Sequence, residues 1–66
     1  MAERISFKEV LKLFELYGWK LQKIIGQHRV FIKKGEFPFH IPVHDKKVDA
    51  EYVKKFKEFL KERGEI

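Results

Sequence analysis

The sequence predicts a single α+β domain with the element order α-β-β-β-α, in which two helices pack on one face of a three-stranded antiparallel sheet. Two segments near the ends of the chain carry apolar residues at the three- and four-residue spacing of a helix. Between them lie three short runs rich in β-branched and aromatic residues. The 66 residues contain no repeat or linker, so one domain over residues 1–66 is expected.

The first helix is predicted from about Phe7 to Tyr17. Ser6 and Glu9 form a capping-box pattern at its start, and Gly18 stands where a left-handed residue commonly ends a helix. The apolar stripe consists of Phe7, Val10, Leu11, Phe14 and Tyr17.

Three antiparallel strands are predicted over residues 19–25, 29–33 and 37–43, separated by turn residues. In the third run apolar residues alternate with polar residues and prolines, so one face of this strand is apolar. Pro38 and Pro42 cannot donate hydrogen bonds, which places the strand at a sheet edge or limits its paired length.

The second helix is predicted from about Ala50 to Arg63, with Asp49 as its N-cap and Gly64 after its last turn. Its stripe consists of Val53, Phe56, Phe59 and Leu60. Two amphipathic helices bury their stripes most simply against one face of the sheet. The opposite face is left for function.

Composition excludes several classes of protein. The chain has no Cys, so neither a disulfide framework nor a cysteine-based zinc site is expected, and stability must come from a core rich in Phe. Lys or Glu interrupts the apolar stretches, and the N-terminus lacks the apolar run of a signal peptide. We therefore expect a cytoplasmic protein that is not associated with a membrane.

The net charge of +5 is concentrated in the middle of the chain. Residues 1–17 and 48–66 are each charge-balanced, whereas residues 18–47 carry seven basic and two acidic side chains. Such a segment is either an ordinary solvated sheet surface or a face that binds phosphates.

Several short motifs resemble one family. Tyr17-Gly18-Trp19, Gly26-Gln27-His28-Arg29-Val30-Phe31, Pro42 with His44, and Phe56-x-x-Phe59-Leu60-x-x-x-Gly64 together are similar to the HicA toxins, over nearly the whole chain. The resemblance implies a fold like the double-stranded RNA-binding domain, cleavage of mRNA, and neutralisation by a HicB-like antitoxin. It also implies that His28, two residues after a glycine, is the essential histidine.

Cleaving RNA without a metal uses the ribose 2′-hydroxyl as nucleophile and needs a base with a pKa near neutrality, which histidine provides. With the family pattern, His28 is predicted to be catalytic; without it, a polar residue at a strand start would be the simpler interpretation. Lys23 and Arg29, on neighbouring strands, are predicted to contact the scissile phosphate, unless they are ordinary surface charges. The basic residues assigned to RNA binding are Lys20, Lys23, Arg29 and Lys33.

His40 and His44 are four residues apart on the predicted third strand, about 13 Å, which is too far for both to bind one zinc ion. Each is a second proton donor, a stacking partner for a base, or part of a polar strand face. Core packing is expected for at least three of Trp19, Phe31, Phe37 and Phe39. No metal or cofactor is predicted.

Three functions remain open at this point. The first is a metal-independent endoribonuclease toxin (mRNA interferase) paired with a HicB-like antitoxin, and the second is a non-catalytic RNA-binding module of the same fold. The third is a relative of HicA that only binds a partner protein.

Overall fold

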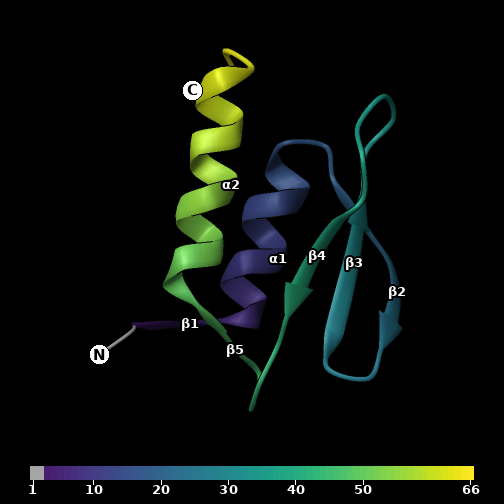
Figure 1. Cartoon of the computed structure of the whole chain (residues 1–66), viewed down its shortest axis with the longest axis vertical. Helices are drawn as coiled ribbons and strands as arrows, with labels where there is room; N and C mark the ends of the chain where they lie inside the picture. The colour runs from purple at the N-terminus through teal and green to yellow at the C-terminus, as the bar shows by residue number, and fades with distance from the viewer. Residues whose placement is uncertain (1–2) are drawn as a thin grey trace.

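The computed structural model describes residues 3–66 and confirms the α+β fold, with two helices and a three-stranded antiparallel sheet in the predicted order (Figure 1). Two further short strands form a small second sheet. The elements are β1 (Arg4–Ser6), α1 (Phe7–Leu16), β2 (Lys20–Ile25), β3 (His28–Ile32), β4 (Phe39–Pro42), β5 (Lys47–Asp49) and α2 (Ala50–Glu62).

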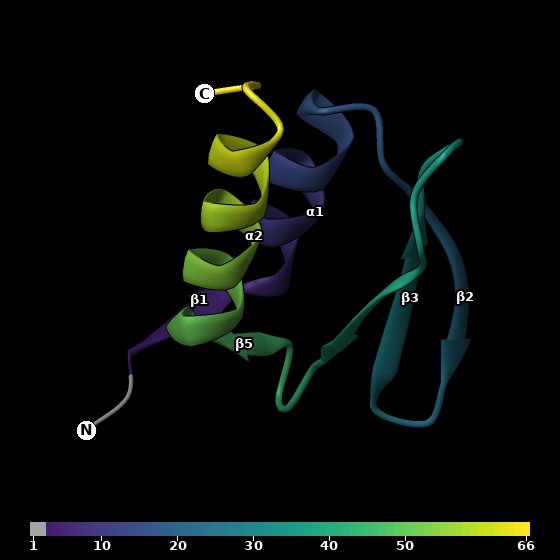
Figure 2. The same ribbon diagram turned by 45° about the horizontal axis from the view of Figure 1, so that its top comes forward.

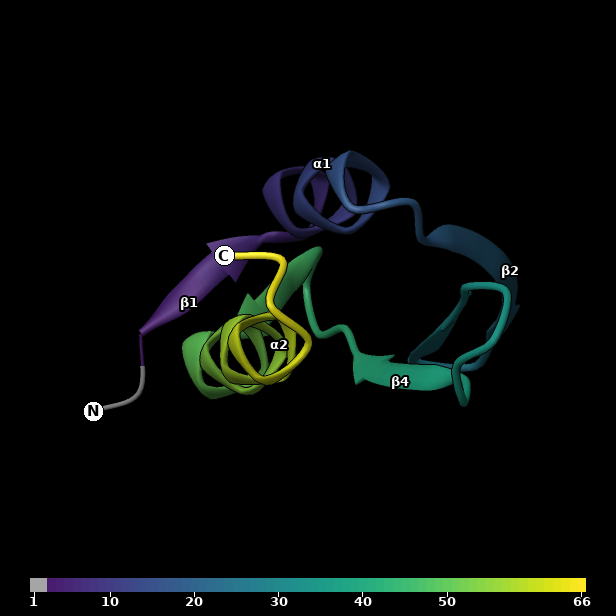
Figure 3. The ribbon, with the colours of Figure 1, turned by 90° about the horizontal axis from the view of Figure 1, so that it is seen from above.

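The larger sheet has the order β2-β3-β4, so β3 is its central strand. Both neighbours run antiparallel to it, and the β2–β3 register shifts between Leu21 and Lys23, which leaves Gln22 as a bulge. Figures 2 and 3 show α1 and α2 on the same side of this sheet, as predicted. No helix of residues 3–66 covers the other side.

β2 and β4 are shorter than predicted. Trp19 precedes β2 and is buried in the core, and β4 begins at Phe39 because Phe37 and Pro38 belong to the loop after β3. β4 lies at the sheet edge, where its proline does not interrupt a second ladder. The central strand begins at His28, one residue earlier than predicted.

The second sheet, β1 with β5, was not predicted from the sequence. Its three cross-strand pairs join residues 4–6 to residues 47–49 in antiparallel register. Each of these strands leads directly into a helix, β1 into α1 and β5 into α2. The small sheet therefore holds the starts of both helices side by side.

This sheet also explains why the predicted side-chain caps are absent. Ser6 and Asp49 are the N-cap residues, but neither side chain makes a capping hydrogen bond. Instead, the N–H of Phe7 donates to the carbonyl of Lys46 at 2.8 Å, and the N–H of Ala50 donates to the carbonyl of Glu3 at 2.8 Å. A helix start needs acceptors for its first N–H groups, and here the main chain provides them.

The helix ends follow the prediction to within one residue. Gly18 has φ +87°, and the N–H of Trp19 donates to the carbonyl of Phe14 at 3.0 Å, which together form the predicted left-handed C-terminal motif. Gly64 ends α2 in the same way, with φ +73°.

An aromatic cluster centred on Phe14 forms the core. The Phe14 ring stacks on Phe56 at a centroid distance of 3.8 Å and on Phe31 at 4.3 Å, and it meets Trp19 and Phe39 edge-on at 6.0 and 5.5 Å. Phe14 thus connects α1 to α2, to the central strand and to the edge strand. Of the four aromatic residues for which core packing was expected, Trp19 and Phe31 are buried and Phe39 packs half-buried against the cluster, whereas Phe37 is 91% exposed.

Candidate functional site

Alternation along β3 assigns its residues to the two faces of the sheet. Phe31 points to the helices and is fully buried in the core, so Arg29 shares this inner face. His28, Val30 and Ile32 point the other way, to what we call the outer face.

Residues directly opposite each other in an antiparallel pair share a face, so the register gives the composition of the outer face. His28 lies opposite Ile25 and Pro42, and one row further along Val30 lies opposite Lys23 and His40. The rows across the sheet are Ile25–His28–Pro42, Lys23–Val30–His40 and Lys20–Ile32.

Val30 is a buried residue at the centre of this face. Val30 is only 2% exposed, although it points away from the helices and does not belong to the core cluster. Its direct cross-strand neighbours are Lys23 and His40, and a lysine at such a position can pack its methylene stem on apolar surface while its ammonium group stays in water. His28 is diagonal to both, at a Cα separation of about 7–8 Å. His28, Lys23 and His40, which we call the outer-face cluster, thus surround one point.

Arg29 does not lie on the outer face with His28 and Lys23, so the structure does not bring together the two cations predicted to contact the scissile phosphate. The guanidinium carbon of Arg29 lies 5.4 Å from the centroid of the Phe7 ring, and its Nη1 donates to the carbonyl of Gly26 at 3.3 Å. Alternation places neighbours in a strand on opposite faces, so His28 and Arg29 cannot both face one phosphate from the outer side.

Lys33 also lies away from the outer-face cluster. Its Nζ is 3.0 Å from Oε1 of Glu65, beyond the end of α2, so its charge is paired on the helix side. Lys20, opposite Ile32, is on the outer face but two rows from His28. Of the four basic residues predicted to bind RNA, Lys23 and Lys20 share the face of His28, and Lys23 is the nearer.

Comparisons with models of protein families, with curated proteins and with solved structures give no match to this chain.

His40 and His44 occupy different environments. His40 is in β4 and belongs to the outer-face cluster, whereas His44 lies beyond the end of this strand. Nδ1 of His44 is 3.2 Å from Nε2 of Gln27, in the turn that joins β2 to β3. Within residues 3–66, no three His, Asp or Glu side chains are arranged to hold a metal ion. The described part of the chain also contains no helix long and apolar enough to cross a membrane.

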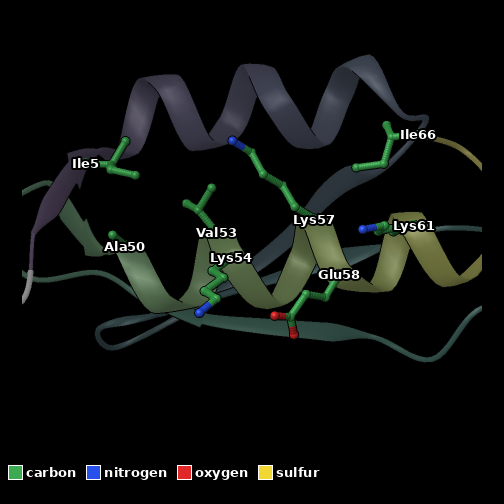
Figure 4. A pocket seen from close by; sticks show the side chains of 8 residues that line it. All are labelled: Ile5, Ala50, Val53, Lys54, Lys57, Glu58, Lys61 and Ile66. Carbon is green, nitrogen blue, oxygen red and sulfur yellow. The ribbon is translucent and has the colours of Figure 1, made fainter.

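A cavity of 430 Å³ in the helix layer is separate from these residues (Figure 4). It is lined by β1, by α2 and by Ile66, and Figure 4 shows Lys57 extending toward α1. None of its lining residues belongs to the three-stranded sheet; they are Ile5, Ala50, Val53, Lys54, Lys57, Glu58, Lys61 and Ile66.

A second, polar pocket lies beside His28 and was missed from the sequence. Its cavity of 120 Å³ is lined by Arg4, Gln27, Pro42, Val43, His44, Lys47 and Asp49. Arg4 and Lys47 could not be assigned to it from sequence, because they are brought together by the unpredicted pairing of β1 with β5. The one feature of the sequence that pointed to this pocket was the Gly26-Gln27 turn, because it immediately precedes His28.

Proposed function

We propose that this protein is a metal-independent endoribonuclease of the HicA toxin type that cleaves mRNA in the cytoplasm. The observation that carries the proposal is the outer-face cluster, in which two histidines and a lysine surround the buried Val30 on the sheet face without helices. Cleavage through the ribose 2′-hydroxyl needs a base, an acid and a cation near the phosphate. In this proposal His28 is the base, His40 is the acid and Lys23 is the cation.

In the proposed reaction, neutral His28 accepts the proton of the 2′-hydroxyl while the 2′-oxygen attacks the adjacent phosphorus. The bond from phosphorus to the 5′-oxygen breaks, and protonated His40 donates a proton to that leaving oxygen. The products are a 2′,3′-cyclic phosphate and a free 5′-hydroxyl, so no water, metal or oxidant is consumed. The Lys23 ammonium group stabilises the negative charge that develops on the non-bridging oxygens.

His28 and His40 occupy diagonal positions on the sheet. This suits the reaction, because the acid and the base must lie on opposite sides of the phosphorus. A Cα separation of about 7–8 Å between His28 and His40 leaves room for a phosphate between their rings. Ile25 and Pro42 flank His28 in its row and offer apolar surface to a ribose or base.

As a toxin, the protein would be held inactive by a HicB-like antitoxin that covers the outer face. This part of the proposal rests on the family resemblance. An adjacent reading frame that encodes a HicB-like protein would support it.

The reaction is tested with single-stranded RNA and purified protein. Cleavage should proceed in EDTA and should yield 2′,3′-cyclic phosphate ends, and a matched oligonucleotide with one 2′-deoxyribose should resist cleavage at that linkage. These results are expected because the 2′-hydroxyl is the nucleophile and no metal takes part. Inhibition by EDTA, or cleavage at the 2′-deoxy position, would exclude this mechanism, and binding without cleavage would leave an RNA-binding module.

A further inference from the structure

The polar pocket beside His28 is assembled from three distant parts of the chain. Arg4 comes from β1, Gln27 from the β2–β3 turn, and His44, Lys47 and Asp49 from the stretch that follows β4 and ends in β5. The N–H of Val43 donates to the carbonyl of Gln27 at 2.6 Å, which fixes that segment against the turn. The pocket is therefore part of the seam between the two sheets.

The register directs the polar side chains of this segment to one side. Arg4 lies opposite Asp49, and Lys47 is two residues before Asp49 on the same strand. His44 and Lys47 exchange two backbone hydrogen bonds of 2.9 Å across a tight turn, so their side chains also share a face.

That turn is held in an unusual conformation. Asp45 and Lys46 have φ of 51° and 61°, in the left-handed region that non-glycine residues rarely adopt. A two-residue hairpin turn of type I′ needs positive φ at both central residues, and this turn returns Lys47 to His44. The strained backbone of Asp45 and Lys46 therefore lies between two residues that line the pocket, His44 and Lys47.

The pocket offers several donors to an anion. The amide nitrogen of Gln27 lies 3.2 Å from Nδ1 of His44, which leaves Nε2 of that ring for a ligand. Nε of Arg4 is 3.6 Å from Oδ1 of Asp49, the one carboxylate in the lining. The two positive charges of Arg4 and Lys47 exceed the single negative charge of Asp49, so the lining has a net positive charge.

Its position relative to His28 indicates which anion would bind. Gln27 precedes His28 in the chain, and Pro42 is the cross-strand partner of His28 on the outer face. An RNA strand whose scissile phosphate lies between His28 and His40 would bring an adjacent phosphate to this pocket.

We infer that the pocket formed by Arg4, Gln27, His44 and Lys47 binds the phosphate of the nucleotide next to the cleaved linkage. This inference rests on the proposed function for the identity of the ligand. The pocket would set the register of the RNA strand relative to His28.

The first test is titration of the full chain with inorganic phosphate, followed by the amide resonances in NMR spectra. Saturable shifts are expected at Gln27, His44 and Lys47, with an affinity about fivefold weaker in Lys47→Ala, the ratio that corresponds to one partly exposed cation. Lys34→Ala, which removes an equal charge from the loop after β3, is the matched control. Equal affinities in both variants, or shifts confined to Lys23 and His28, would overturn the inference.

The second test uses 2′-O-methyl oligonucleotides, which cannot be cleaved, with one neutral methylphosphonate linkage placed at each position in turn. One position adjacent to the site of cleavage should weaken binding to the wild-type chain about fivefold and leave binding to Lys47→Ala unchanged. A loss of the same size in both proteins would contradict the inference.

The two proposals fail separately in these experiments. If the wild-type chain binds phosphate in the pocket but cleaves no RNA, the endoribonuclease is wrong and the pocket stands. If RNA is cleaved and the methylphosphonate effect does not depend on Lys47, the pocket is wrong and the endoribonuclease stands.

Discussion

Replacing His28 with Ala is expected to lower the rate of RNA cleavage by about 10²–10⁴-fold, the usual contribution of a positioned general base. His28 is exposed on the outer face and makes no core contact, so the fold should be retained. Affinity for RNA should change little, because the ring moves a proton rather than neutralising a phosphate. Gel assays of cleavage, binding curves and circular dichroism measure the three quantities.

Two comparisons make this result specific to proton transfer. Added imidazole should restore part of the activity of His28→Ala, and His40→Ala should also lose activity if it is the acid. Lys55→Ala on α2, whose Nζ lies 5.6 Å from the Tyr52 ring, is the control and should cleave at the wild-type rate. Cleavage by His28→Ala at the wild-type rate would end the assignment, and a loss accompanied by a changed circular dichroism spectrum would give His28 a structural role.

Replacing Phe14 with Ala is expected to destabilise the fold by about 3–5 kcal/mol, the usual cost of removing a buried Phe. The side chain is fully buried and contacts aromatic rings from α2, β3 and β4. A domain of this size has a net stability of roughly 3–5 kcal/mol, so the variant should be largely unfolded at 25 °C. Urea unfolding followed by Trp19 fluorescence gives the comparison.

Phe37→Ala is the matched control, because Phe37 is 91% exposed. Its free energy of unfolding should stay within about 0.5 kcal/mol of the wild-type value. If Phe14→Ala and Phe37→Ala unfolded at the same urea concentration, the aromatic cluster would not be the source of stability.

The helices and the central sheet could be predicted because their signals are local. The stripe around Phe14 and the glycine at position 18 determine α1 within the segment itself, and the β-branched and aromatic runs do the same for the strands. The short sheet could not be predicted. Three-residue strands carry no usable periodicity, and the pairing of β1 with β5 depends on where both helices pack.

The candidate site was predictable only in part. Alternation alone would have separated Arg29 from His28, since adjacent residues in a strand point to opposite faces. The place of Lys23 on the outer face depends on the bulge at Gln22, which changes the alternation within β2 and has no clear signal in the sequence. The charge of Lys33 is paired with Glu65, 32 residues away, which is a tertiary contact.

The pairing of β1 with β5 has a consequence for the order in which the chain assembles. Ser6 pairs with Lys47, whereas the β3–β4 ladder already begins with Phe31 opposite Phe39. Closing the longer loop costs about 1.5 kcal/mol more entropy than closing the shorter one. We therefore expect the small sheet to form last and to open first, so the amides of Phe7 and Ala50, which bond across it, should exchange hydrogen faster than those of β3. Arg4 and Lys47 stand on its two strands, and a phosphate held between them would slow this exchange by keeping the chain closed.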